Sequence, residues 1–181
     1  MVTFAQLPDA QPSSLAEAAE TWTLHARDMG RRAAEMEAEV LGSLTRWSGP
    51  ASQAAVQKLN RLVDKLAEAH AAMQRVSDIL DPACRAITAA QADLGSAVEY
   101  AHRRGLTVED DGSVSWLDWN PVEWAEDREA AQHASDLLQD ALRRANEADA
   151  DAAADLRVAQ LVGQGKASLS ALSRSDAPQA G

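Results

Sequence analysis

The chain has 181 residues, a length that fits one globular domain or at most two small ones. Its formal net charge of −11 argues against general binding to nucleic acids or to anionic membranes, because an acidic surface repels phosphate groups. Alanine is the most frequent residue, whereas Phe and Tyr occur once each, and this bias excludes a β-sandwich, a β-barrel or a doubly wound α/β fold. We therefore expect an all-α protein, an elongated antiparallel bundle of three long helices with a short β-hairpin between the second and third.

The first 12 residues carry two prolines and little periodicity, which predicts an irregular N-terminal arm over 1–12. This arm lacks the basic and apolar segments of a signal peptide. Ser13 and Ser14 predict an N-cap, with a glutamate at capping-box spacing three residues after Ser14. From there apolar residues recur every three or four positions, a pattern typical of a helix that buries one stripe against another helix. A first helix is therefore predicted over 13–47.

A sharp corner is predicted at Ser48-Gly49-Pro50. Glycine adopts the left-handed conformation that ends many helices, and proline suits the first turn of the next helix although it cannot extend the previous one. A second helix follows over 50–104, with apolar residues stepping alternately by four and three. The apolar pattern keeps its helical phase across Asp81-Pro82, and two structures are possible there. The helix either continues with a kink or breaks, with Asp81 capping a new helix.

Residues 106–116 alternate apolar and polar side chains on either side of Asp111-Gly112, which predicts a short β-hairpin. Two strands alone are marginally stable, so the hairpin must pack against the bundle. Trp116, Trp119 and Trp124 are close in sequence, and they predict an aromatic cluster that supplies this packing.

A third helix is predicted over 121–162, after an Asn-Pro pair that serves as N-cap and first helical residue. Its apolar stripe is rich in alanine, which allows close approach to neighbouring helices. The three helices and the hairpin then form a bundle over 13–162. Residues 163–181 are rich in Gly, Ser and Ala and are expected to form a flexible tail.

No catalytic or metal-binding pattern emerges from the sequence. The four histidines (His25, His70, His102 and His133) lack the i, i+4 partner of a helical zinc site. Cys84 is the single cysteine, so an internal disulfide is excluded, and it shows no nucleophile signature. We therefore expect a protein that is not an enzyme and that holds no cofactor and no metal.

The corner Trp47-Ser48-Gly49-Pro50 lies between a helix of roughly 35 residues and small residues that enter a second amphipathic helix. This arrangement resembles the WXG100 family of helical-hairpin substrates and adaptors of type VII (ESX-like) secretion. The resemblance covers about residues 10–104, and the remainder resembles longer actinobacterial members. It implies a helical partner, which could be a WXG100-like protein, a secreted effector or a second copy. It also implies no membrane insertion and a secreted or cell-surface location reached without a signal peptide.

The family's export signal is a tyrosine followed four residues later by an acidic residue, near the end of the second helix. Here Tyr100 is followed at that spacing by Arg104, so the resemblance implies a degenerate signal whose function a partner could supply. Two functions stay open. The first is a non-enzymatic type VII secretion substrate or adaptor that docks helix against helix. The second is a cytoplasmic helical chaperone or immunity-like protein whose acidic surface matches a basic effector.

Overall fold

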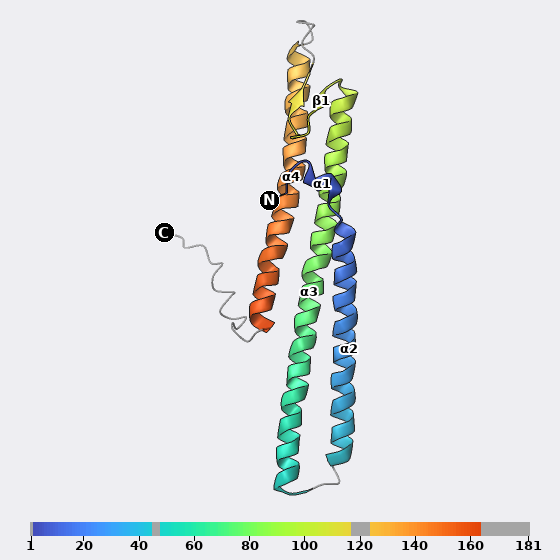
Figure 1. The fold of residues 1–181 in the computed structure, drawn as a ribbon, viewed down its shortest axis with the longest axis vertical. Helices are drawn as coiled ribbons and strands as arrows, with labels where there is room; N and C mark the ends of the chain where they lie inside the picture. The colour runs from blue at the N-terminus through green and yellow to red at the C-terminus, as the bar shows by residue number, and fades with distance from the viewer. Residues whose placement is uncertain (1, 45–47, 117–123, 164–181) are drawn as a thin grey trace, which may run out of the picture. The chain divides into compact units, whose positions relative to one another are not determined.

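The computed structural model describes residues 2–44, 48–116 and 124–163. Its elements in chain order are α1 (Gln6–Asp9), α2 (Pro12–Leu44), α3 (Pro50–Arg103), β1 (Thr107–Val108), β2 (Val114–Ser115) and α4 (Trp124–Gly163) (Figure 1). The expected fold class is confirmed, because three long helices dominate the chain and a two-stranded hairpin separates α3 from α4. Trp47, Trp119 and the expected tail from residue 164 lie outside the described residues.

Contacts divide the chain into two compact units. Unit 1 consists of Met1–Ala16 and Asp81–Ala153, and unit 2 consists of Glu17–Leu80 and Ala154–Gly181. Each of the three long helices therefore contributes to both units. The boundary on α3 falls at Asp81, next to Pro82.

α3 is continuous through Pro82, so the alternative of a break at Asp81 is wrong. A proline inside a helix removes one backbone hydrogen bond and leaves the carbonyl four residues earlier without its usual partner. Both Asp78 and Pro82 are exposed, so that carbonyl lies on the solvent side of the helix, where water can bond it. Leu80 and Ala83 are buried on either side of the proline, and their burial keeps the helical phase.

The N-terminal segment is more regular than the irregular arm expected from the sequence. Thr3 accepts backbone hydrogen bonds from Gln6 and Leu7, which begins the single turn of α1. Leu7 is completely buried, and Gln91 of α3 donates its side-chain amide to the carbonyl oxygens of Leu7 (2.9 Å) and Ala10 (2.8 Å). One turn with one buried leucine is too short to produce a periodic pattern, and this is why the sequence did not reveal it.

α2 begins at Pro12, the position at the start of a helix that proline favours. Ser14 lies inside the helix and donates its hydroxyl to the carbonyl of Gln11 (2.7 Å). The N-cap expected at Ser13 and Ser14 is therefore wrong, because proline takes the first helical position instead.

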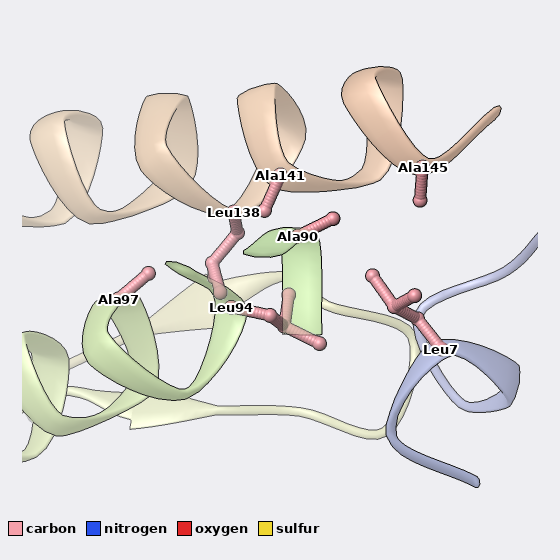
Figure 2. Close-up of a cluster of buried hydrophobic side chains, with 7 residues drawn as sticks. All are labelled: Leu7, Ala90, Leu94, Ala97, Leu138, Ala141 and Ala145. Carbon is pink, nitrogen blue, oxygen red and sulfur yellow. The ribbon is translucent and has the colours of Figure 1, made fainter. Parts of the chain in front are cut away.

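The core of unit 1 joins α3, α4 and α1 (Figure 2). Leu94 of α3 and Leu138 of α4 point into the space between the two helices, and Leu7 closes the cluster from α1. The remaining members of the cluster are alanines with 0–2% exposure: Ala90, Ala97, Ala141 and Ala145. Small side chains let the two helix backbones approach closely, as the alanine-rich stripe of the third helix predicted.

The hairpin packs on this core through its inward-facing valines. β1 and β2 are antiparallel, with Val108 opposite Val114, and both contact the core of unit 1. Gly112 has φ +84°, and the carboxylate of Asp111 accepts a hydrogen bond from the backbone N–H of Ser113 (2.8 Å). The turn thus lies where Asp111-Gly112 predicted it.

Candidate partner-binding surface

In unit 2, α2 lies alongside the first part of α3 (Figure 1). Most apolar stripe positions of the two helices are only half-buried there, although Ala26 of α2 and Leu80 of α3 are buried. We call these half-buried residues the hairpin stripe: Ala18, Met29, Ala33, Met36 and Val40 of α2, with Ala55, Leu59, Leu66, Ala69, Met73 and Val76 of α3. Such a surface has room for a further apolar helix.

Among the described side chains of the same two helices, three large apolar ones are exposed. Trp22 is 38% exposed, Leu24 is 56% exposed and Leu62 is 43% exposed. Trp22 and Leu62 belong to the apolar pattern of the sequence, but Leu24 stands outside it, so sequence reasoning missed it. These exposed side chains lie on the same two helices as the hairpin stripe, and this makes the hairpin the candidate binding surface.

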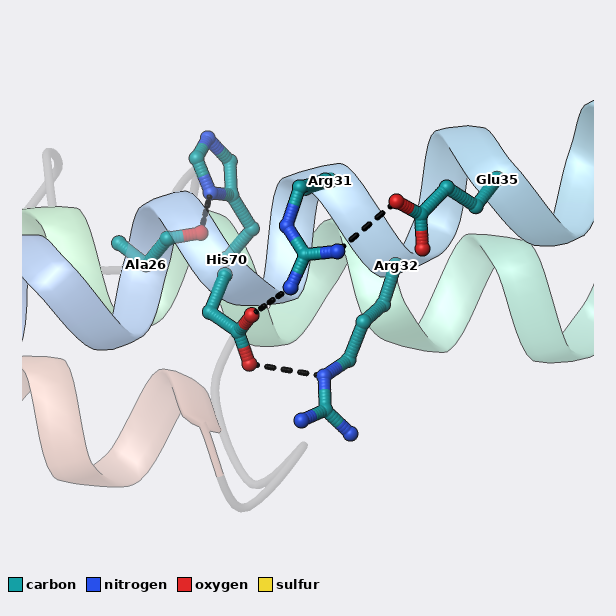
Figure 3. Close-up of polar contacts among 6 residues, drawn as sticks. Ala26, Arg31, Arg32, Glu35 and His70 are labelled. Atoms are coloured by element: carbon teal, nitrogen blue, oxygen red, sulfur yellow. Dashed lines mark hydrogen bonds and ion pairs between the residues drawn. The ribbon is translucent and has the colours of Figure 1, made fainter.

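Polar contacts fix the register between α2 and α3, and no sequence pattern revealed them. Ser77 donates its hydroxyl to the carbonyl of Ala19 (2.9 Å) and lies 2.7 Å from the hydroxyl of Thr23. His70 Nδ1 lies 2.6 Å from the carbonyl oxygen of Ala26 (Figure 3). A Cβ atom on Gly30 would come within 3.2 Å of the same imidazole, so glycine is the residue that leaves room for it.

An exposed network of charges runs along α2 beside this contact (Figure 3). Asp28 accepts hydrogen bonds from both Arg31 and Arg32, and Arg31 also pairs with Glu35 at 2.8 Å. These hydrogen bonds, first from Arg31 and then from Arg32, hold the pKa of Asp28 below its usual value. The network is on the solvent side of the helix and contributes to charge balance rather than to chemistry.

The described part of the predicted corner consists of Ser48, Gly49 and Pro50. Gly49 has φ +117°, a conformation that favours glycine, and a Cβ atom there would meet none of the described residues within 4 Å. Pro50 is the first residue of α3, and the carbonyl of Gly49 accepts a hydrogen bond from Gln53 (3.2 Å). Trp47, the first residue of the corner motif, lies outside the described residues.

Tyr100 and Arg104, the residues of the suggested degenerate export signal, contact one another in unit 1. The guanidinium carbon of Arg104 is 5.7 Å from the centre of the Tyr100 ring, and His133 of α4 meets that ring edge-on at 5.1 Å. These three residues border an open pocket of about 460 Å³, together with Glu126 and Glu129. Acidic side chains therefore lie near Tyr100 and Arg104, on α4 rather than on α3.

The aromatic cluster expected from three tryptophans is described only at Trp116. Its side chain is half-buried and packs against the buried cluster that includes Ala101 and Leu106, and its indole N–H has no hydrogen-bond partner among the described residues. The side chain of Trp124, in the first turn of α4, is not among those described. The cluster thus stays a prediction.

The described residues contain no candidate metal-binding cluster. No group of three or more His, Cys, Asp or Glu side chains in 2–44, 48–116 and 124–163 has the geometry to hold a metal ion. Cys84 is a free, half-buried thiol. Within the same ranges, no helix combines the length and the apolar character needed to cross a bilayer.

Comparison with known proteins identifies one family. The model of the PPE family matches residues 7–109, from α1 to the start of the hairpin. No curated protein and no solved structure matches the chain. PPE proteins form a non-enzymatic helical family associated with ESX, or type VII, secretion, and the family is related to WXG100 but distinct from it. The resemblance to WXG100 therefore led to the right secretion system through a neighbouring family. Because the match spans more than half of the sequence, the chain belongs to the PPE family.

Proposed function

We propose that this protein is a type VII secretion substrate or adaptor that binds a helical partner through the hairpin of α2 and α3 in unit 2. Its membership of the PPE family supports the link to type VII secretion. The main support for this location of the docking surface is the half-burial of the hairpin stripe, together with the exposure of Trp22 and Leu62. A partner helix laid on this surface would bury the apolar area that two helices alone leave open.

The charge of the hairpin supports an apolar contact rather than an electrostatic one. Residues 17–80 contain nine acidic and eight basic side chains, so this part of unit 2 is close to neutral although the chain has a net charge of −11. A partner matched mainly by charge would instead need a strongly acidic docking face. The partner that fits this surface is therefore an amphipathic helix or helical hairpin with an apolar stripe of its own.

The finer parts of the proposal come from the WXG100 resemblance. In that reading Trp47 and Gly49 shape the corner, a partner supplies the acidic export signal that Tyr100 and Arg104 lack, and the complex leaves the cell without a signal peptide. The alternative function, a cytoplasmic helical chaperone for an effector, uses the same docking surface. The two differ in where the protein is found.

The experiment uses the tagged full chain in its native host. Wild-type protein should accumulate in the culture medium only when the membrane ATPase of the secretion system is active, and it should co-purify with one helical protein in equal amounts. Trp22→Arg and Leu62→Arg should reduce both export and co-purification about tenfold or more, because a charge buried against an apolar helix without a partner is costly.

Leu137→Arg is the matched control, since Leu137 is 37% exposed but belongs to α4 of unit 1. Circular dichroism should show equal helicity for all three variants. Export that is independent of the ATPase would contradict the secretion role. Equal loss of binding in the Leu137 variant would contradict the location of the docking surface.

A further inference from the structure

The first turns of α3 carry three basic side chains next to the exposed Leu62. Lys58, Arg61 and Lys65 are all exposed, and none of them forms an ion pair with a described residue. On the other helix of the same hairpin, by contrast, Arg31 pairs with two acidic residues of its own helix. The three cations of α3 are therefore available to an acidic group from outside the described chain.

The seven-residue pattern of α3 places two of these cations on the flank that α2 does not cover. His70 and Ser77, which contact α2, lie seven residues apart on one flank of the hairpin stripe. Lys58 and Lys65, also seven residues apart, lie on the opposite flank. In paired helices, charged residues at such flanking positions form ion pairs with the neighbouring helix and help to decide which helix binds.

The same flank of α3 is apolar where α4 lies beside it and basic where α4 has ended. Ile79, two heptads after Lys65, lines a groove together with Val158 in the last turns of α4. α4 ends at Gly163, and α3 extends beyond that point with α2 beside it (Figure 1). Among the described residues of unit 2, the flank at Lys58 and Lys65 is therefore open to a partner.

At the same level of the hairpin, α2 carries the opposite charge. Nine residues from the contact of His70 with the Ala26 carbonyl, Arg61 of α3 lies level with Glu35 of α2. Residues 33–44 of α2 contain three exposed glutamates and no basic residue. The nearly neutral hairpin is thus acidic on one helix and basic on the other, so an acidic group is attracted to α3 and repelled by α2.

We propose that the helix that docks on the hairpin stripe carries acidic side chains along the flank that lies over α3, where they pair with Lys58, Arg61 and Lys65. This inference rests on the proposed function and adds the charge pattern of the partner. Exposed ion pairs contribute little individually, so apolar contact still supplies most of the affinity. The acidic flank decides which amphipathic helix binds, because a basic flank meets like charges at this position.

Designed peptides measure this preference with the full chain. Three fluorescein-labelled peptides of about 25 residues, long enough to form a helix, share one leucine stripe and differ only in one flank, which carries glutamate, glutamine or lysine. Fluorescence anisotropy gives the Kd of each peptide. At low salt the glutamate peptide should bind about fivefold or more tightly than the glutamine peptide, and the lysine peptide should bind most weakly. The differences should fall below about twofold in about 1 M salt, where charges are screened within about 3 Å.

Reversing the three cations should reverse the order of the peptides. In the combined variant Lys58→Glu, Arg61→Glu and Lys65→Glu, the lysine peptide should bind most tightly. Circular dichroism should show unchanged helicity, because all three side chains are exposed. If the helicity falls, Lys58→Gln with Lys65→Gln replaces this variant and should reduce the preference for glutamate about twofold or more.

The matched control changes the net charge by the same amount at other exposed positions. It combines Arg27→Glu, Arg128→Glu and Arg157→Glu, three arginines that form no ion pair with a described residue. The order of the three peptides should stay as in the wild type. An equal change of order in the control would show that net charge alone sets the preference, and this would overturn the proposal.

The remaining outcomes separate this proposal from the proposed function. Equal Kd values for the three peptides, with all binding lost in Trp22→Arg, would overturn the acidic flank and leave the docking surface intact. Absence of binding by every peptide would contradict both. Equal peptide binding, together with binding to phosphatidylserine-containing vesicles that the combined variant loses, would assign the three cations to an anionic membrane surface and overturn the proposal.

Discussion

α3 carries one uninterrupted apolar pattern, yet its two halves are buried to very different degrees. In unit 1 the stripe positions Ala90, Leu94, Ala97 and Ala101 are 0–3% exposed, because α4, α1 and the β-hairpin all contribute neighbours. In unit 2 the equivalent positions of α3 are half-buried or, at Leu62, exposed, and Leu80 at the boundary is buried. Burial is therefore decided by how many elements pack around a stripe, and the periodicity of the stripe alone does not reveal it.

The largest expected difference between the units concerns one leucine in each. Leu138 is 1% exposed in the core of unit 1, and Leu138→Ala should lower the free energy of unfolding by about 3 kcal/mol through lost burial and the cavity left behind. Leu62 is 43% exposed in unit 2, so Leu62→Ala should cost less than about 1 kcal/mol in the isolated chain.

Urea denaturation followed by circular dichroism measures both variants. The two variants should rank the opposite way in their affinity for the helical partner. Leu62→Ala should weaken the complex, whereas folded Leu138→Ala should bind the partner as the wild type does. If Leu62→Ala costs as much stability as Leu138→Ala, the hairpin stripe is better packed than its exposure indicates.

Two glycines with positive φ sharpen the comparison. Gly112 in unit 1 has φ +84°, and a Cβ atom there would lie 2.9 Å from Cδ2 of Phe4. Gly49 in unit 2 has φ +117°, and no described residue lies within 4 Å of a Cβ atom placed there. Gly112→Ala adds a collision to backbone strain and should cost about 2–3 kcal/mol, whereas Gly49→Ala should cost about 1 kcal/mol from strain alone.

Thermal unfolding measures both glycine variants. Gly95→Ala serves as a reference, because Gly95 lies inside α3 with nothing within 4 Å of its Cβ position, and alanine should stabilise that helix by about 0.5–1 kcal/mol. An equal loss of stability at Gly112 and Gly49 would show that Phe4 moves aside at no cost.

The sequence predicted the elements that have a repeating residue pattern and missed the element that depends on individual contacts. Long helices and a glycine turn produce patterns over many residues, so α2, α3, α4 and the hairpin were foreseeable. α1 was not, because its order depends on the burial of Leu7 and on the amide of Gln91, two residues far apart in sequence. The continuity of α3 at Pro82 was undecided for a similar reason, since solvent exposure of the freed carbonyl is a property of the fold.

The candidate surface was foreseeable in outline only. The corner glycine and the apolar stripe predicted a helical hairpin, and the resemblance to WXG100 implied type VII secretion. The PPE match agrees with a helical family associated with that secretion system. The exposure of Leu24 and the register contacts of Ser77 and His70 needed the structure. A serine or histidine within a helix shows no sequence signal for bonding to a carbonyl on the neighbouring helix, because the partner atom belongs to the backbone.

A smaller effect is expected where one side chain holds the N-terminal segment. Gln91→Leu removes the hydrogen bonds to the carbonyls of Leu7 and Ala10 and should cost about 1 kcal/mol. Hydrogen exchange should rise in α1 and remain unchanged in α4. Gln132→Leu is the matched control, because the amide of Gln132 bonds to Asp136 on its own helix. Unchanged exchange in α1 would show that burial of Leu7 alone holds this segment.

The smallest effects concern two exposed aspartates, one in each unit. Asp28 bonds to Arg31 and Arg32 within α2, and Asp140 bonds to Arg143 and Arg144 within α4. In each case the arginine hydrogen bonds, with Arg31 and Arg143 the main causes, hold the carboxyl pKa below its ordinary value of 3.8. A carboxyl whose pKa is lower in the folded state stabilises the fold above its unfolded value and loses that contribution as the pH falls through the folded value.

The melting temperature measured between pH 7 and pH 2.5 should therefore fall less steeply below pH 4 in Asp28→Asn and Asp140→Asn than in the wild type. The Asp140 variant should show the larger change, because Arg144 also pairs with Asp93 of α3 (2.9 Å) and so connects two helices of unit 1. Asp28 and its arginines lie on one helix of unit 2, where losing the pair changes no contact between helices. Equal slopes for the two variants would show that the connection through Arg144 adds nothing to the stability of unit 1.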